Sequence, residues 1–192
     1  GEMTEEQIVV NYIYKLKDTS VVVNYITEDG QPMTDPIIIN GKVNDNYTTE
    51  AKTFTGYELT AIPDNATGTM AEEQIVVNYI YKLKDTSVIV QYIDEEGTKL
   101  TDDVLIKGKC FEIYSTDAKD FYGYYLTEVP FNAEGRMGEE QITVTYVYAK
   151  SPASVVVNYK TEDGKPLTDS VTLTGKVFDK YDTEAKEFYG YE

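Results

Sequence analysis

The chain has 192 residues, with 34 acidic side chains against 17 basic ones, no histidine and a formal net charge of −17 at pH 7. Nucleic acids and anionic membrane surfaces bind basic proteins, so this charge argues against both as partners. One cysteine excludes an intrachain disulfide, and the absence of histidine excludes the ordinary catalytic triad and imidazole metal sites. No run approaches the ~18 apolar residues of a transmembrane helix, so we expect no membrane insertion.

The dominant feature of the sequence is a repeat of fixed length. The segments VVVNYITEDG, VIVQYIDEEG and VVVNYKTEDG begin at Val21, Val88 and Val155, a gapless spacing of 67 residues. A period this long predicts tandem domains, because roughly 60 residues can just close a core of their own. The predicted domains are the C-terminal end of a preceding repeat over 1–20, complete repeats over 21–87 and 88–154, and the N-terminal part of a further repeat over 155–192.

The first half of each repeat is predicted to form two strands. Period-2 alternation places Val21, Val23 and Tyr25 on the buried face of the first strand, and the opposite face varies between repeats. A Glu-Asp-Gly turn follows, where glycine allows a positive φ. The second strand covers about 36–44 and contains a bend or bulge at Gly41.

The second half of the repeat begins with the only stretch compatible with a helix. This stretch, Tyr-Thr-Thr-Glu-Ala-Lys at 47–52, is polar and long enough for about one turn. A strand near 57–62, a loop at 63–69 and a final strand around 74–82 are expected after it. The final strand has the longest alternation in the chain, with one face made of Ile75, Val77, Tyr79 and Tyr81.

The combined pattern VxVxY-x-x-EDG, Y-x-TEAK-x-F-x-GYELT and QI-x-VxYxY resembles the MucBP (mucin-binding protein) repeat of Gram-positive surface proteins, which include adhesins and some internalins. The resemblance covers effectively the whole chain. It implies a mainly β (α+β) fold of tandem ubiquitin-like β-grasp repeats, in which the first and last strands are parallel neighbours in the sheet centre. It also implies extracellular display on the bacterial cell wall and, for some members, adhesion to mucin. The stretch at 47–52 is shorter than the usual β-grasp helix, and the short connectors favour an elongated rod.

One variable position suggests a ligand site. Thr55 aligns with Tyr122 and Tyr189, a substitution pattern expected of an exposed position. A tyrosine beside Phe-Gly-Tyr can stack on a sugar ring, although a solvated aromatic side chain needs no ligand to explain it. Tyr122 and Tyr189 are therefore the candidate ligand-binding residues.

Other candidates for chemistry have simpler explanations. Cys110 aligns with Val43 and Val177, which predicts a buried, inert side chain. The acidic Glu-Asp-Gly turns offer oxygen ligands for Ca²⁺, but none has full EF-hand spacing, and we predict no metal or cofactor. Enzymatic activity is disfavoured because an active site normally uses singular residues, whereas nearly every notable residue here recurs in each repeat.

The sequence leaves two functions open. The favoured one is an adhesin array that binds host mucin, glycoprotein or glycan weakly and multivalently, since linked sites gain avidity without new contacts. The alternative is a purely structural stalk that projects another domain from the cell wall. We also expect head-to-tail self-association, because 1–20 and 155–192 each leave a strand edge without its partner.

Overall fold

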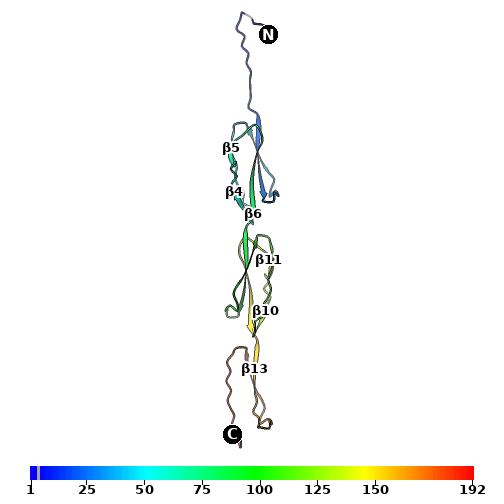
Figure 1. Ribbon diagram of the computed structural model, residues 1–192, viewed down its shortest axis with the longest axis vertical. Coiled ribbons are helices and arrows are strands. Elements are labelled where there is room, and N and C mark those ends of the chain that lie inside the picture. The colour runs from blue at the N-terminus through cyan, green and yellow to red at the C-terminus, as the bar shows by residue number, and fades with distance from the viewer. Residues whose placement is uncertain (4) are drawn as a thin grey trace. The chain divides into compact units, whose positions relative to one another are not determined.

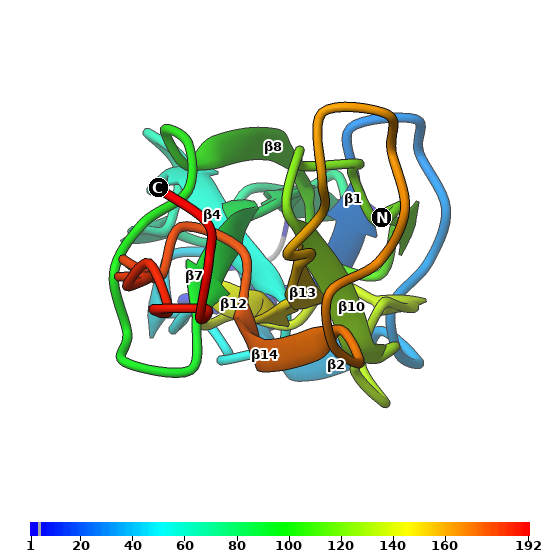
Figure 2. The same cartoon turned by 90° about the horizontal axis from the view of Figure 1, so that it is seen from below.

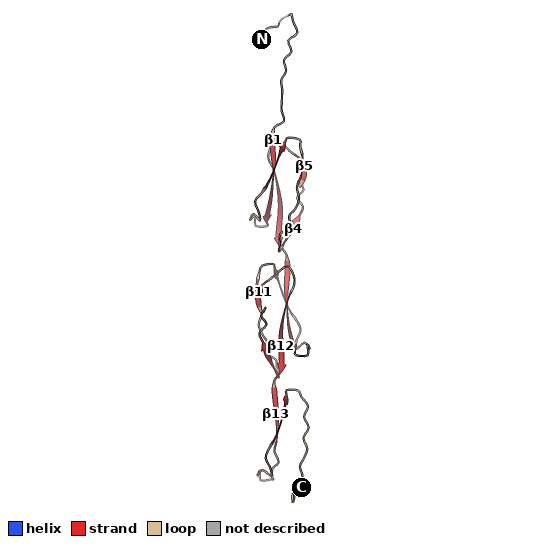
Figure 3. Ribbon diagram, turned by 180° about the vertical axis from the view of Figure 1, so that it is seen from behind, coloured by secondary structure: helices blue, strands red, loops and turns tan. Residues whose placement is uncertain are grey.

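The computed structural model describes residues 1–3 and 5–192, and the chain divides into two compact units, Gly1–Lys84 and Asp85–Glu192 (Figure 1). Strands are the only regular structure in the described residues, and none of those residues is helical (Figure 3). No helix able to cross a membrane therefore occurs in this part of the chain. The mainly β prediction is confirmed.

The first unit contains a four-stranded sheet and a separate two-stranded one. Its strands are β1 (Asp18–Thr27), β2 (Ile37–Lys42), β3 (Asn46–Thr48), β4 (Tyr57–Ala61), β5 (Thr67–Thr69) and β6 (Ile75–Leu83). The larger sheet has the order β2-β1-β6-β4, and β3 pairs with β5. β1 and β6 are parallel, with Val21 opposite Ile75, and β2 and β4 are antiparallel to their neighbours. The predicted parallel pairing of the first and last strands is thus present at the sheet centre.

The second unit repeats this arrangement and adds a hairpin. Its strands are β7 (Asp85–Asp94), β8 (Val104–Lys109), β9 (Ile113–Ser115), β10 (Tyr124–Glu128), β11 (Glu134–Arg136), β12 (Ile142–Lys150), β13 (Pro152–Val157) and β14 (Val171–Lys176). The four-stranded sheet has the order β10-β12-β7-β8, and β9 pairs with β11. β13 and β14 form an antiparallel pair, labelled near each other in Figure 2.

The alternation predicted for the two central strands is confirmed by burial. The first core contains Val21, Val23 and Tyr25 from β1 together with Val77, Tyr79 and Tyr81 from β6. The second contains the equivalent side chains Val88, Val90, Tyr92, Val144, Tyr146 and Tyr148. These two paired faces supply six of the nine buried residues in each core. Burying a large apolar side chain contributes roughly 1.5–3 kcal/mol. Tyr25 and Tyr79 also stack, with ring centroids 5.5 Å apart.

The helical turn predicted at 47–52 is wrong. Residues 49–52 have no helical hydrogen bonding and instead bind side chains of the sheet. Tyr25 Oη donates to the carbonyl of Glu50 at 2.9 Å, and Thr49 Oγ1 donates to the carbonyl of Ala66 at 2.8 Å. Buried backbone groups need partners, and here Tyr25 of β1 binds the Glu50 carbonyl while Tyr81 of β6 binds the Lys52 amide, so no helix is needed to satisfy them.

The strand expected within 1–20 is also absent over most of its length. Residues 5–17 are not in a strand, and β1 begins at Asp18. The alternating residues of this segment, Ile8, Val10, Tyr12 and Tyr14, are all exposed. Alternation alone does not make a strand, because a strand needs a neighbour to take up its backbone hydrogen bonds.

Candidate functional site

The candidate residue Tyr122 lies in a turn that the core holds in place. Phe121, directly before it, packs edge-on against Tyr148, with ring centroids 5.0 Å apart. The Tyr124 amide donates to the Phe121 carbonyl at 3.1 Å, and Gly123 between them has φ of +81°. This geometry points Phe121 toward the core and leaves Tyr122 90% exposed.

Tyr122 belongs to a partly exposed aromatic cluster, which consists of Tyr122, Tyr124 and Phe178. Phe178 follows β14 and lies with its ring centroid 6.2 Å from that of Tyr122 and 5.8 Å from that of Tyr124. The interplanar angle to Tyr122 is 66°, an edge contact of the kind aromatic pairs prefer. The contact restricts the Tyr122 ring while most of its surface stays in water.

Sequence reasoning missed Phe178, although a signal was present. Phe178 aligns with Asn44 and Phe111, a position that changes from a small polar residue to an aromatic one. The position of Thr55, Tyr122 and Tyr189 changes in the same way. The two positions meet in the second unit through Tyr122 and Phe178.

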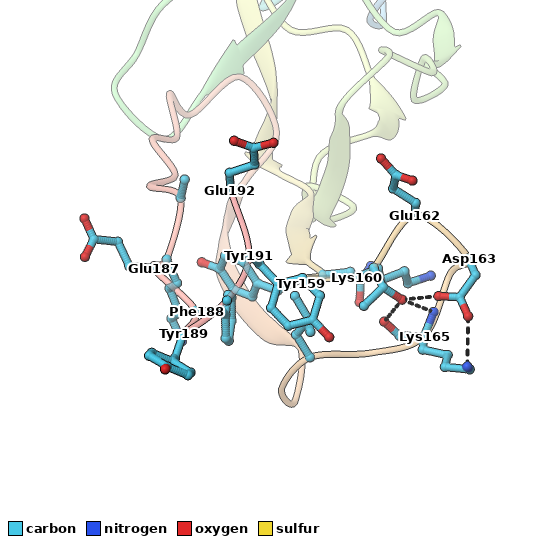
Figure 4. A pocket seen from close by; sticks show the side chains of 16 residues that line it. Tyr159, Lys160, Glu162, Asp163, Lys165, Glu187, Phe188, Tyr189, Tyr191 and Glu192 are labelled. Atoms are coloured by element: carbon cyan, nitrogen blue, oxygen red, sulfur yellow. Dashed lines mark hydrogen bonds and ion pairs between the residues drawn. The ribbon is translucent and has the colours of Figure 1, made fainter.

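Tyr189 occupies the equivalent turn near the end of the chain, and its side chain is fully exposed. It lines an open groove of about 1430 Å³ together with Tyr159, Lys165, Phe188 and Tyr191. Figure 4 shows Tyr189 at one side of this groove, with Asp163 and Lys165 at the other. The structure thus places the two candidates on separate turns of the second unit rather than in one site.

The groove displays side chains that are core residues elsewhere. Tyr159 lies 5.7 Å from Phe188 between ring centroids, as Tyr25 lies 6.1 Å from Phe54 in the first core. In the first core, the ring of Tyr79 stacks on the ring of Tyr25. The groove therefore exposes aromatic side chains whose equivalents are core residues in the first repeat, and charged side chains make up much of the rest of its lining.

One side of the groove carries an ion pair at the acidic turn. Lys165 Nζ lies 2.9 Å from Asp163 Oδ2, and Thr161 Oγ1 donates to Asp163 Oδ1 at 2.5 Å. The hydrogen bond from Thr161 and then the one from Lys165 lower the pKa of Asp163. In the first repeat the Thr27 hydroxyl binds Asp29 in the same way. Over the described residues, no group of three or more potential metal ligands occurs.

Cys110 has the predicted environment. Its side chain is completely buried, and Sγ lies 3.3 Å from the carbonyl oxygen of Gly138, to which the thiol donates. A thiol enclosed in this way is shielded from reagents and behaves as a small apolar side chain.

Comparison with known proteins gives a consistent family match. The model of the MucBP domain matches residues 20–82, 87–149 and 154–192. Internalin J of Listeria monocytogenes serotype 4b (strain F2365) is 36% identical over 201 residues, and the match covers 100% of this chain and 22% of that protein. Muramidase-released protein of Streptococcus suis is 30% identical over 207 residues, which cover 99% of this chain and 15% of that protein.

Among solved structures, the type 2 repeat of the mucus binding protein MUB from Lactobacillus reuteri aligns with a TM-score of 0.27 and 16% identity. That alignment covers 69% of this chain and 100% of the repeat. The present chain spans less than a quarter of the length of each of these two relatives, Internalin J and muramidase-released protein.

Proposed function

Because this chain belongs to the MucBP domain family, we propose that it forms part of an extracellular, non-enzymatic adhesin array on a Gram-positive cell wall. Its repeats bind mucin-type glycoprotein or glycan weakly, and their number raises the avidity. We further propose that each repeat is a ubiquitin-like β-grasp in which an extended segment replaces the helix. The parallel pair of β1 and β6 at the centre of the sheet supports this assignment.

The observation that carries the binding proposal is the exposure of Tyr122. Its ring is held at one edge by Phe178 and is otherwise open to solvent. A restrained aromatic ring offers a large amphipathic surface at small entropic cost, and its face is apolar enough to pack on the C–H groups of a sugar. Tyr189 presents the same side chain from the equivalent turn.

The charge of the chain narrows the ligand class. A net charge of −17 repels sialylated and sulfated glycans. We therefore expect neutral sugars to bind best and binding to tolerate salt. A single exposed ring gives weak affinity, so useful adhesion depends on several repeats acting together.

The test is binding of the 192-residue chain to immobilised mucin and to a panel of neutral glycans. Replacing Tyr122 and Tyr189 together by threonine, the residue at position 55, should reduce avidity by about tenfold or more. Tyr125→Glu is the matched control, because it also removes a half-exposed tyrosine and introduces the residue found at the equivalent Glu58. Thr55→Tyr should raise avidity.

Unchanged mucin binding by the double variant would refute the assignment to Tyr122 and Tyr189. Failure of the unmodified chain to bind any glycan or mucin would refute the binding function itself. In that case the structural stalk, the second candidate, would be preferred.

The stalk receives support from the connection between β12 and β13. Ser151 is the single residue between the two strands. Its amide donates to the carbonyl of Gly123 at 2.8 Å, and its carbonyl accepts the amide of Val177 at 2.8 Å. A connection without free linker residues transmits position and force better than a flexible one.

A further inference from the structure

The turn after β14 has a backbone conformation that its residue does not favour. The amide of Asp179 donates to the carbonyl of Lys176 at 3.1 Å, which closes a four-residue turn with Phe178 in third place. Phe178 has φ of +71°. Glycine or asparagine normally occupies such a position, and a bulky residue there is strained.

The same turn in the first repeat uses the residue that this conformation favours. The amide of Asp45 donates to the carbonyl of Lys42 at 3.0 Å, and the third residue is Asn44, with φ of +72°. The fold of the turn therefore does not require phenylalanine. Because strained residues persist where another interaction compensates for them, the contacts of the Phe178 ring become informative.

Those contacts are with the Phe-Tyr-Gly-Tyr turn at 121–124. The Phe178 ring packs against Tyr122 and Tyr124 and lies directly over Gly123. A Cβ atom added to Gly123 would stand 2.7 Å from Phe178 Cζ and 2.8 Å from Val177 Cγ1. Only glycine leaves room for this approach.

We propose that the 121–124 turn is a docking socket for the repeat that follows it and that Phe178 is the side chain that fills the socket. Docking positions the 154–192 region on the repeat before it, so these two repeats are coupled rather than independent. The identity of residue 178 then acts as a specificity determinant. An aromatic ring docks, whereas the asparagine of the first repeat lacks the surface to do so.

Polar contacts also cross this junction. Ser151 makes two backbone hydrogen bonds there, since its amide donates to the carbonyl of Gly123 and its carbonyl accepts from the amide of Val177. The ion pair of Lys176 with Glu95 has an N–O distance of 3.3 Å between half-exposed side chains, and such pairs contribute little. The aromatic contact is the part that depends on residue 178, because the equivalent backbone bond, from the amide of Val43 to the carbonyl of Lys17, also forms beside Asn44. This inference does not depend on glycan binding.

The experiment measures hydrogen exchange of the Ser151 amide in the full 192-residue chain. Gly123→Ala should accelerate this exchange by about tenfold or more, because the new methyl group displaces Phe178 and Val177. Gly97→Ala is the matched control. Gly97 lies in the same repeat with φ of +82°, and a Cβ atom added there would meet no heavy atom within 4 Å, so this variant places alanine at a similar φ without the collision. Because Gly123 itself accepts the Ser151 hydrogen bond, a variant that leaves Gly123 unchanged is also needed.

A second variant separates docking from simple strain. Phe178→Gly relieves the unfavourable φ. If Phe178 had no docking role, this variant would leave the Ser151 amide equally or better protected from hydrogen exchange. The proposal predicts faster exchange, with amides of β7 and β12 unchanged. Equal exchange in the Gly123→Ala and Gly97→Ala variants, or undiminished protection in Phe178→Gly, would overturn it.

Discussion

Tyr81 Oη forms two hydrogen bonds with the backbone of Lys52, accepting from its amide at 3.0 Å and donating to its carbonyl at 2.7 Å. One side chain of the central strand therefore satisfies both polar groups of a residue in the segment crossing the sheet. Tyr148 makes the same pair of bonds with Lys119, at 2.9 and 2.8 Å. This relationship explains how residues 49–52 remain ordered without forming a helix.

Tyr81→Phe should lower the free energy of unfolding of the first unit by about 1–2 kcal/mol, because both Lys52 groups lose their partner while the ring and its packing remain. Urea denaturation followed by circular dichroism measures the change. Tyr12→Phe serves as the control, since Tyr12 is exposed. Equal stability of the two variants would show that the hydroxyl of Tyr81 is dispensable.

Stability should fall at alkaline pH because several core tyrosines resist ionisation. Burial, as the leading cause, raises the pKa of Tyr25, Tyr81, Tyr92 and Tyr148 above the ordinary value of 10.0. The unfolded chain then loses these protons at lower pH than the folded chain does. Their contribution to stability is fully present below about pH 10 and is lost as the pH rises through the folded pKa values.

The measurement is the urea midpoint between about pH 8 and 11. We expect a plateau followed by a decline, and a shallower decline for a variant carrying both Tyr81→Phe and Tyr148→Phe, which has fewer shifted groups. If the urea midpoint of this variant declined just as steeply, the loss of stability at alkaline pH would be due to general charge repulsion rather than to these tyrosines.

Cys110→Val should be neutral or slightly stabilising. The equivalent residues are Val43 and Val177, and the thiol, a weak donor, gives up only one hydrogen bond, to the carbonyl of Gly138. A volume-conserving apolar replacement usually costs less than ~1.5 kcal/mol. Thermal denaturation measures the effect, and a native-state reaction with a thiol reagent as fast as that of free cysteine would contradict the buried assignment.

The predicted core agreed with the structure because period-2 alternation reports directly on which face of a strand is buried. Val21, Val23 and Tyr25 were identified in this way, as were Val77, Tyr79 and Tyr81. The error at 47–52 has a different origin. The Glu-Ala-Lys stretch favours a helix locally, but the hydroxyl groups that hold its backbone belong to Tyr25, 25 positions before Glu50, and to Tyr81, 29 positions after Lys52.

The candidate site was only partly predictable for a similar reason. The exposure of Tyr122 followed from its alignment with Thr55, whereas its neighbour Phe178 lies 56 positions away and in another repeat. The short strands β3 and β5 were also missed. With three residues each, they contain too little alternation to be recognised.

The last prediction concerns association between copies of the 192-residue chain. Residues 5–20 have the same sequence as residues 72–87, which include β6, yet in the first segment the side chains equivalent to the β6 core face are exposed. In the described part of the chain, β13 pairs with β14 alone, and the nearby groove displays Tyr159 and Phe188. We expect residues 7–15 of one copy to pair with β13 of another and cover that groove, which joins copies head to tail.

Such contacts are heterologous and do not close, so association should increase with concentration rather than stop at a dimer. Analytical ultracentrifugation of the chain over a wide concentration range measures this growth. Tyr12→Asp should suppress it by placing a charge where the equivalent Tyr79 is buried, while the matched change of the exposed Tyr125 to Asp should not. A chain that stays strictly monomeric at high concentration would rule out this pairing between copies, because both the exposed segment and the groove are present in every copy.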